Sequence, residues 1–272
     1  LMLELTKYNA VMKNAYEDIA PHKICAYIYD LANAFNRFYH ETKILAEETA
    51  KSAKIAGIST AEAVQYMTSA INGFNLAATD ATRVSDVFAN LAAASATDFE
   101  DLAIAVSKVS AQANLAGMSL EYTTALLAKG IETTQEAPES IGTALKTIVA
   151  RMRELSSYGS VLEDGASVNK VERALASAGI ELRNVNGEFR DLEEIFSELG
   201  PKWDYLNTMQ QQAIAQAVAG TRQQSRFVAI MQDWGRTQEL IAEANASEGA
   251  SAAQYQEYAQ GIEAALTRMK TS

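Results

Sequence analysis

Apolar residues recur three or four positions apart along most of the chain, and this spacing predicts amphipathic helices. Between residues 23 and 45 they follow a pattern close to i, i+4, i+7 and i+11. Further apolar stripes follow between residues 64 and 127, and Pro138 opens a longer amphipathic helix. Only three prolines interrupt the chain, so long helices are permitted. We therefore expect a mostly α protein made of helical hairpins or a bundle.

Helix starts are indicated where a hydroxyl residue precedes a Glu or Gln by three positions, because the two side chains then satisfy backbone N–H groups of the first turn. The pairs are Ser59 with Glu62, Thr97 with Glu100, Thr208 with Gln211, and Thr221 with Gln224. Gly57, Gly117 and Gly220 mark expected helix ends, because glycine adopts the left-handed conformation without strain.

Two segments depart from the helical pattern. Residues 156–169 contain two glycine-centred clusters of small and polar residues and are predicted to form a loop. Residues 180–190 place Asn186 and Gly187, which take positive φ readily, between two short extended arms. The expected fold is thus mostly α, with one small β-hairpin near residues 180–190.

Composition changes abruptly near Glu48. Seven of the 21 aromatic residues, both histidines and the single cysteine lie in the first 48 positions, whereas Ala, Ser, Thr, Asn and Gln on helical spacing dominate afterwards. We therefore expect pieces of two unrelated proteins and a division into three units. These are a helical segment at 1–48, an Ala-rich helical bundle at 49–157, and a loop, hairpin and C-terminal helices at 158–272.

The overall charge limits the partners. A net charge of −11 argues against a general nucleic-acid binder, which needs a surface of Lys and Arg to displace counterions from phosphates. The longest uncharged runs, at 63–79 and 205–221, contain polar residues and so do not predict a membrane span. One cysteine allows no disulfide within the chain. We expect a soluble protein.

The first unit carries a specific resemblance. Residues 19–41 combine Pro-His, Tyr-x-Tyr-Asp-Leu-Ala and Phe-Asn-x-Phe-Tyr in one order, and they resemble the C-terminal anticodon-binding helical domain of arginyl-tRNA synthetases. The resemblance implies packing against the anticodon stem and loop of tRNA, with Asn36, Tyr39 and His40 as RNA contacts. Aromatic residues at helical spacing are more often core residues, and we favour that interpretation. The synthetase catalytic domain has no counterpart in the chain.

The rest of the chain carries a second resemblance, in six motifs. They are AGIS-x-x-E at 56–62, SATDFEDLA at 95–103, IGTALK at 141–146, NGEFRD at 186–191, Trp203-Asp204, and AGTRQ at 219–223. In this order they resemble the core region of phage tail tape measure proteins.

This resemblance implies a long helical protein of the virion tail, assembled in the host cytoplasm, that sets tail length and leaves the tube ahead of DNA. Its implied partners are the tail tube, the tail assembly chaperones and the tail tip. Such families also carry long coiled coils, which are missing from this chain, so length measurement itself cannot reside here. The expected role is an assembly or anchoring module.

No arrangement of residues predicts catalysis, a cofactor or a metal site. His22, His40 and Cys25 lack a second Cys/His pair at zinc spacing, and no phosphate-binding glycine loop is present. Arg222 beside Thr221 can bind a carboxylate or phosphate at a helix entry, but an arginine there more often anchors a neighbouring loop, and we favour that structural role.

Three hypotheses follow. The leading one is a non-enzymatic structural protein of the phage tail, with the function after residue 48. The alternative, from another class, is a fragment of arginyl-tRNA synthetase that binds the anticodon region of tRNA without catalysis. In the third, the first segment is a fused leader with no role in either process.

Overall fold

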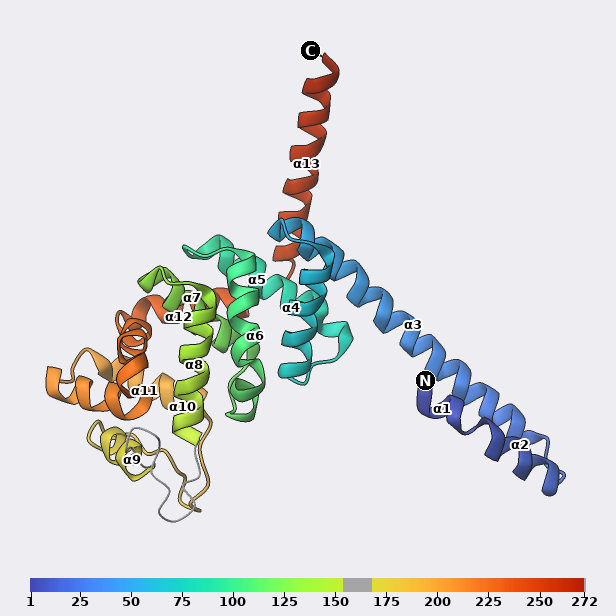
Figure 1. Ribbon diagram of the computed structural model, residues 1–272, viewed down its shortest axis with the longest axis horizontal. Coiled ribbons are helices and arrows are strands. Elements are labelled where there is room, and N and C mark those ends of the chain that lie inside the picture. Colours follow the sequence, from blue (N-terminus) through green and yellow to red (C-terminus); the bar gives the residue numbers. More distant parts are fainter. Residues whose placement is uncertain (154–167, 272) are drawn as a thin grey trace.

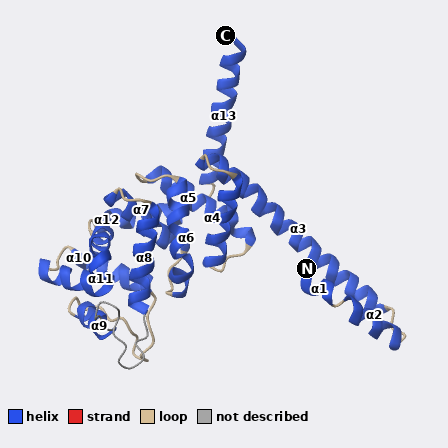
Figure 2. Cartoon of the chain, viewed as in Figure 1, coloured by secondary structure: helices blue, strands red, loops and turns tan. Residues whose placement is uncertain are grey.

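The computed structural model describes residues 1–153 and 168–271 (Figure 1). Helices joined by turns make up this part of the chain, and it contains no β-strand (Figure 2). The elements are α1 (Met2–Thr6), α2 (Tyr8–Glu17), α3 (His22–Ala56), α4 (Thr60–Gly73), η1 (Ala78–Asp80), α5 (Ala81–Ala94), α6 (Phe99–Leu115), α7 (Leu120–Thr134), α8 (Pro138–Arg153), α9 (Val168–Ala176), α10 (Leu192–Trp203), α11 (Thr208–Met231), α12 (Trp234–Asn245) and α13 (Ala250–Thr271).

The helices α4 to α12 form a bundle. α6 lies between α4 and α8, and α7 packs against α5, α11 and α12 (Figure 1). Large buried side chains fill the space between them: Phe88 meets the edge of Phe99 at 5.5 Å between ring centroids, and Trp203 meets Phe227 at 5.6 Å. This burial stabilises the bundle by roughly 25 cal/mol per Å² of apolar surface. The predicted helical bundle is confirmed.

Small residues allow some of these helices to approach closely. A side chain at Gly142 of α8 would place its Cβ 2.4 Å from the carbonyl oxygen of Ala105 on α6. Ala105 is itself fully buried. At this crossing the backbones of α6 and α8 are therefore in close contact.

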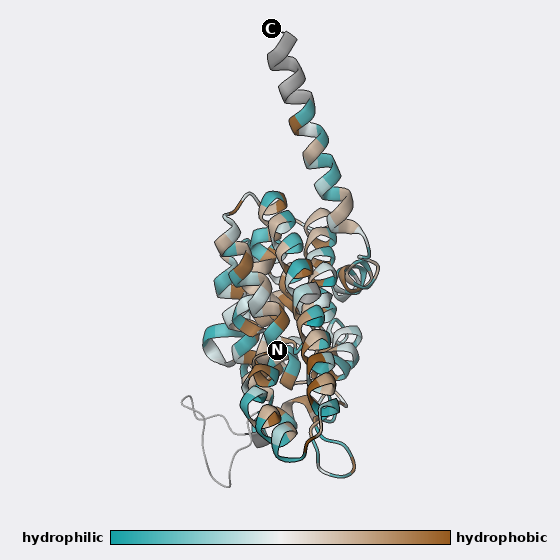
Figure 3. Ribbon diagram, turned by 90° about the vertical axis from the view of Figure 1, so that its right-hand side faces the viewer, coloured by the Kyte–Doolittle hydropathy of each residue, from teal (hydrophilic) through white to brown (hydrophobic). Residues whose placement is uncertain are grey.

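Two long helices leave the bundle as arms. The N-terminal half of α3 extends away from it, with α1 and α2 folded back along it (Figure 1). α13 leaves the bundle in another direction (Figure 3). α3 passes through Glu48 without a break and ends at Gly57, whose φ is 70°. The change of composition near residue 48 thus lies inside one helix.

The helix caps confirm one predicted pair and correct two. Ser59 and Glu62 form a capping box at the start of α4. α6 is capped by Asp98, whose carboxylate accepts from the backbone N–H of Asp101, and not by Thr97. α11 is capped by Asn207 with Gln210, one position before Thr208. Asp98 and Asn207 hold the cap because they are the extended residues before the first turn.

The predicted β-hairpin near residues 180–190 is wrong. The chain reverses there, but only one isolated antiparallel bridge forms, between Arg183 and Phe189. The side-chain oxygen of Asn184 accepts from the backbone N–H groups of Asn186 and Glu188, each at 3.0 Å, and so holds the turn in place of a ladder. Two arms this short, without a third strand beside them, are too few to form a sheet.

The loop predicted at residues 156–169 lies outside the described residues, apart from its last two, which begin α9. Within the part of the chain that is described, no helix is both long and apolar enough to cross a bilayer.

Candidate functional site

The α3 arm exposes an unusual amount of apolar surface. Among the described residues, 18 large hydrophobic side chains are exposed, and 11 of them lie between residues 2 and 39. Tyr39 is 62% exposed and stacks on Phe35 at 6.4 Å with an interplanar angle of 16°. Asn36 is exposed beside them. The expectation that these aromatics fill a core is therefore wrong for Phe35 and Tyr39.

The other side of the arm is covered by α1 and α2. The hydroxyl of Tyr27 donates to the backbone oxygen of Glu4 at 3.1 Å, and Tyr27 is buried together with Ala15 and Ala20. Lys23 forms an ion pair with Asp18 across the turn between α2 and α3. These contacts fix the helices of the arm against each other and leave Asn36 and Tyr39 on the open side.

The arm offers stacking surface without a strong positive charge. Lys7, Lys13 and Lys23 each pair with a carboxylate of the same arm. Unpaired bases can stack on Tyr39 and Phe35, but phosphate contacts need basic groups that these pairs occupy. His40 lies on α3 between Tyr39 and the bundle, and its side chain falls outside the described residues.

A second feature lies where α11 is interrupted at Gly220. This residue has φ 70° and ψ 173°, a conformation that only glycine adopts readily, and the helix resumes at Thr221. Beside the interruption is a cavity of about 550 Å³ between α8 and α11. Its lining includes Thr143 and Arg151 of α8 and Arg222 of α11.

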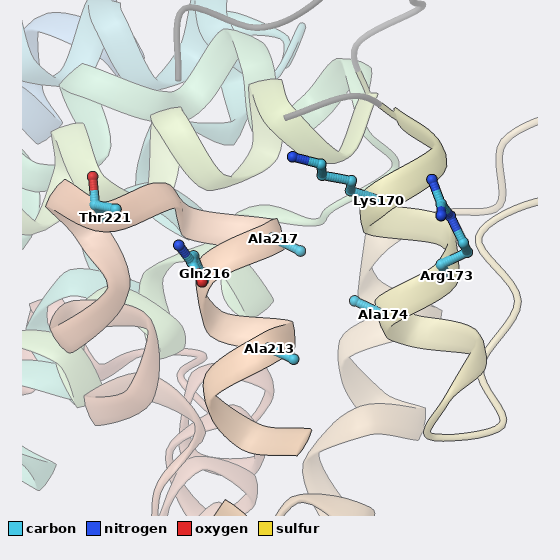
Figure 4. Close-up of a pocket in the computed structure, with 7 residues that line it drawn as sticks. All are labelled: Lys170, Arg173, Ala174, Ala213, Gln216, Ala217 and Thr221. Carbon is cyan, nitrogen blue, oxygen red and sulfur yellow. The ribbon is translucent and has the colours of Figure 1, made fainter. Parts of the chain in front are cut away.

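A smaller cavity of about 330 Å³ adjoins the first and lies between α9 and α11. Lys170 and Arg173 line it from α9, and Thr221 borders both cavities (Figure 4). Lys170 extends toward the α11 side of the cavity (Figure 4). We call the two cavities together the basic groove. None of the described residues that line the basic groove carries a carboxylate.

Thr221 and Arg222 are exposed at the edge of this groove, and neither side chain makes a hydrogen bond or ion pair with another described residue. Their role as a loop anchor stays a prediction. The arginine that ties this region to a neighbouring loop is Arg226, one turn later, whose guanidinium donates to Glu136 at 2.8 and 2.5 Å. No local pattern predicts this pair, because 90 positions separate its members.

A third arginine, Arg236, joins α12 to two other elements. It donates to both carboxylate oxygens of Glu132 at 3.1 and 3.0 Å and to the backbone oxygen of Ala94 at 2.6 Å. Hydrogen bonding from Arg236 lowers the pKa of Glu132, while the partial burial of that carboxyl acts the other way. Arg236 and Arg226 therefore have structural roles that sequence reasoning missed.

Carboxylates gather at the opposite end of the bundle, where α4, α6 and α8 begin. We call Glu62, Asp98, Glu100, Asp101 and Glu139 the acidic end. Partial burial, then repulsion from the neighbouring carboxylates, raises the pKa of Glu100, and burial followed by the charge of Asp98 raises the pKa of Asp101. In the described part of the chain, no group of three or more His, Cys, Asp or Glu side chains is placed to hold a metal.

Comparison with known families gives two matches. A family model described as phage-related minor tail protein matches residues 39–220. A second, described as DALR anticodon binding domain, matches residues 1–70. The two matches confirm both resemblances seen in the sequence, and they overlap on α3 and α4. No solved structure matches the chain.

Curated arginine–tRNA ligases match the N-terminal segment. The chain is 73% identical over 48 residues to an arginine–tRNA ligase of Agathobacter rectalis, which covers 18% of this chain and 8% of the ligase. It is 49% identical over 47 residues to that of Alkaliphilus oremlandii, covering 17% and 8%, and 45% identical over 58 residues to that of Francisella tularensis subsp. novicida, covering 21% and 10%. The chain thus spans a tenth or less of the length of these relatives.

Proposed function

Because this chain belongs to the family of phage-related minor tail proteins, we propose that its bundle is the core module of a tape measure protein that acts in tail assembly and tail length determination. The observation that carries this proposal is the extent of the family match, which covers 182 of 272 residues, from α3 to Gly220. That range contains α4 to α10 and the first part of α11, which together hold most of the buried core.

The shape of the chain supports an anchoring role within this function. Two long helices, α3 and α13, project from one side of a compact bundle, where they also pack against each other (Figure 1). A bundle of fixed size cannot measure a length by itself, so we assign it to holding and positioning other tail components. The partners proposed are the tail tube, the assembly chaperones and the tail tip. The proposed location is the virion tail, assembled in the host cytoplasm, and the proposed activity is structural, not enzymatic.

We also propose the division of the chain into units at 1–48, 49–157 and 158–272. The change in composition supports the first boundary, and the family matches support different origins on its two sides. The second boundary rests on the change from helical spacing to a loop in the sequence.

Electron microscopy of tails tests the proposed function. In a phage that encodes this chain, deletion of residues 49–272 should leave tails absent, scarce or of altered length. A single change, Phe88→Ala, removes a fully buried ring and should reduce tail yield, whereas Leu115→Ala on the 81% exposed Leu115 should not. Tails of normal length, number and infectivity in the deletion would overturn the proposal.

The anticodon-binding alternative concerns the arm alone. The identity of 73% over 48 residues with a ligase supports it, and the stacked pair of Phe35 and Tyr39 gives it a surface. A mobility-shift assay of the whole chain with arginine tRNA at low salt should then show a complex that Tyr39→Ala weakens. Tyr205→Ala, which changes an exposed tyrosine on the bundle, is the matched control. Absence of any complex at low salt would leave the arm without this role.

A further inference from the structure

The two projecting helices are attached to the bundle in different ways. Among the apolar side chains of α13 that are described, Ala250 alone packs against the buried core cluster, and residues 256–263 are exposed. At the base of α3, by contrast, Leu45, Ile55 and Ala56 all pack against that cluster. Burial of apolar surface therefore fixes α3 against the bundle and contributes little to the direction of α13.

A carboxylate from another helix caps the start of α13. The helix begins at Ala250, and Gly249 before it has no side chain to accept from the N–H groups of the first turn. The buried carboxylate of Asp86, on α5, takes this place. It accepts from the backbone N–H groups of Gly249 and Ser251, each at 2.9 Å, and from the hydroxyl of Ser251 at 2.5 Å. Its negative charge also lies favourably at the positive end of the helix dipole.

The turn before α13 does not fix the direction of the helix by itself. Gly249 has φ 83°, and no described residue beyond its chain neighbours lies within 4 Å of the position that a Cβ would take there. A glycine in open space can change its backbone angles at little cost. A further contact, from the amino group of Lys54 on α3 to the hydroxyl of Tyr255 at 3.2 Å, is exposed to water, which competes for it.

We propose that the three hydrogen bonds to Asp86 form a latch that sets the direction of α13, and that α13 turns about Gly249 when this latch opens. With 22 residues, α13 is long enough to remain helical after its release. The α3 arm keeps its place, because its apolar base does not depend on Asp86. This property of the fold is independent of the role of the chain in the tail.

Distances between two spin labels, measured by double electron–electron resonance on the whole chain, test the latch. One label is placed at Leu115→Cys, an 81% exposed site on the bundle, and the other at Gln260→Cys on α13, with Cys25→Ser removing the native cysteine. With Asp86 present, the labels should give one narrow distance. Asp86→Ala should broaden it and lower the ratio of docked to undocked α13 by about tenfold or more, since each hydrogen bond to a charged group contributes at least that factor.

Two controls separate the latch from a general loosening of the bundle. Leu115→Cys paired with a label on the native, exposed Cys25 reports the direction of α3, and this distance should stay the same in Asp86→Ala. Ser85→Ala removes a buried hydroxyl one position before Asp86 on α5, and that hydroxyl bonds Ser52 of α3. It should leave the distance to α13 narrow.

Ser251→Ala decides the matter if Asp86→Ala does not fold, as judged by circular dichroism. It removes only the hydroxyl bond of the latch and leaves α5 intact, so it should broaden the distance to α13 less than Asp86→Ala does. Two results would overturn the proposal. One is a narrow, unchanged distance to α13 in folded Asp86→Ala or, where that variant does not fold, in Ser251→Ala. The other is an equal broadening of the distance to α3, or of the distance to α13 in Ser85→Ala.

Discussion

The ion pair of Arg236 with Glu132 makes stability depend on acid pH. The folded pKa of Glu132 is lowered by Arg236, so its stabilisation is fully present above the unfolded value of about 4.3 and is lost as pH falls through the folded pKa. Glu132→Gln should therefore lower the free energy of unfolding at pH 7 by about 1 kcal/mol, and by much less near pH 3. Urea unfolding at both pH values measures this.

The control uses the same arginine. Glu239 also contacts Arg236, at 3.2 Å, but its side chain is 69% exposed. Glu239→Gln should change the unfolding free energy by less than about 0.5 kcal/mol at either pH. An equal loss of unfolding free energy in both variants would show that the pair of Arg236 with Glu132 stabilises the fold no more than the exposed pair with Glu239 does.

Gly142 tests the close approach of α6 and α8. Gly142→Ala should lower the free energy of unfolding by about 1–3 kcal/mol, because its Cβ would meet the backbone oxygen of Ala105 at 2.4 Å. Gly261→Ala in α13 has open space around the added methyl and should stabilise the helix by up to about 1 kcal/mol. Thermal melts of both variants give the comparison, and a neutral Gly142→Ala would contradict the tight packing.

Two helix caps and one arginine contact were not predicted from the sequence, and each has a physical reason. Thr97 precedes Asp98, and Thr208 follows Asn207, so two capping residues stand side by side at each helix start and the backbone angles decide between them. Arg222 drew attention because it lies in a motif, but the contact belongs to Arg226, which meets Glu136 only when α11 packs beside the loop before α8. Long-range partners follow from packing, and no local pattern encodes them.

Gly220 interrupts helix α11. Gly220→Ala would force a side chain into φ 70° and ψ 173°, so it should destabilise the bundle by about 1–3 kcal/mol or straighten the helix and deform the adjoining basic groove. Circular dichroism melts measure the first outcome, and protection of amides near Thr221 from hydrogen exchange reports the second. If Gly220→Ala changed neither stability nor hydrogen exchange, the claim that this position requires glycine would be contradicted.

Helical elements were predictable from apolar spacing, since burial of one stripe determines each helix. The segment at 180–190 was not, because the pattern that signals a hairpin also fits a turn closed by the side chain of Asn184. A ladder of hydrogen bonds needs neighbouring strands, but the elements before and after this segment are the helices α9 and α10. The glycine at 220 was predicted as a helix end, and the observed left-handed residue between two helical runs agrees with that.

The arm and the bundle should differ in their importance for folding of the chain. The buried core cluster begins at Met67. Leu45 is partly buried and packs against this cluster from outside. Removal of residues 1–43 should therefore change the melting temperature of the bundle by less than about 4 °C and reduce binding of a hydrophobic dye, because the exposed apolar residues are gone.

A longer truncation is the matched control. Removal of residues 1–58 also deletes Ser52, which forms a buried hydrogen bond of 2.5 Å with Ser85, and the buried Ala53. This truncation should lower the melting temperature clearly. If the shorter truncation already abolished cooperative melting, the arm would be part of the folding unit.

The change in composition agrees with the two family matches, but it could not predict that one helix runs through both matched regions. Helix α3 continues because no glycine or proline lies between Pro21 and Gly57, and the stripe that meets α1 and α2 goes on to meet the bundle. Continuity of this kind depends on local propensity, whereas the family of each part depends on its motifs.

Peptide mass spectrometry of purified virion tails tests the central claim most directly. A phage that encodes this chain should carry peptides from residues 49–220 in its tails, and Phe88→Ala should lower their amount together with the number of tails. Tails of full length and infectivity that contain no peptide from this range would contradict a structural role in the tail.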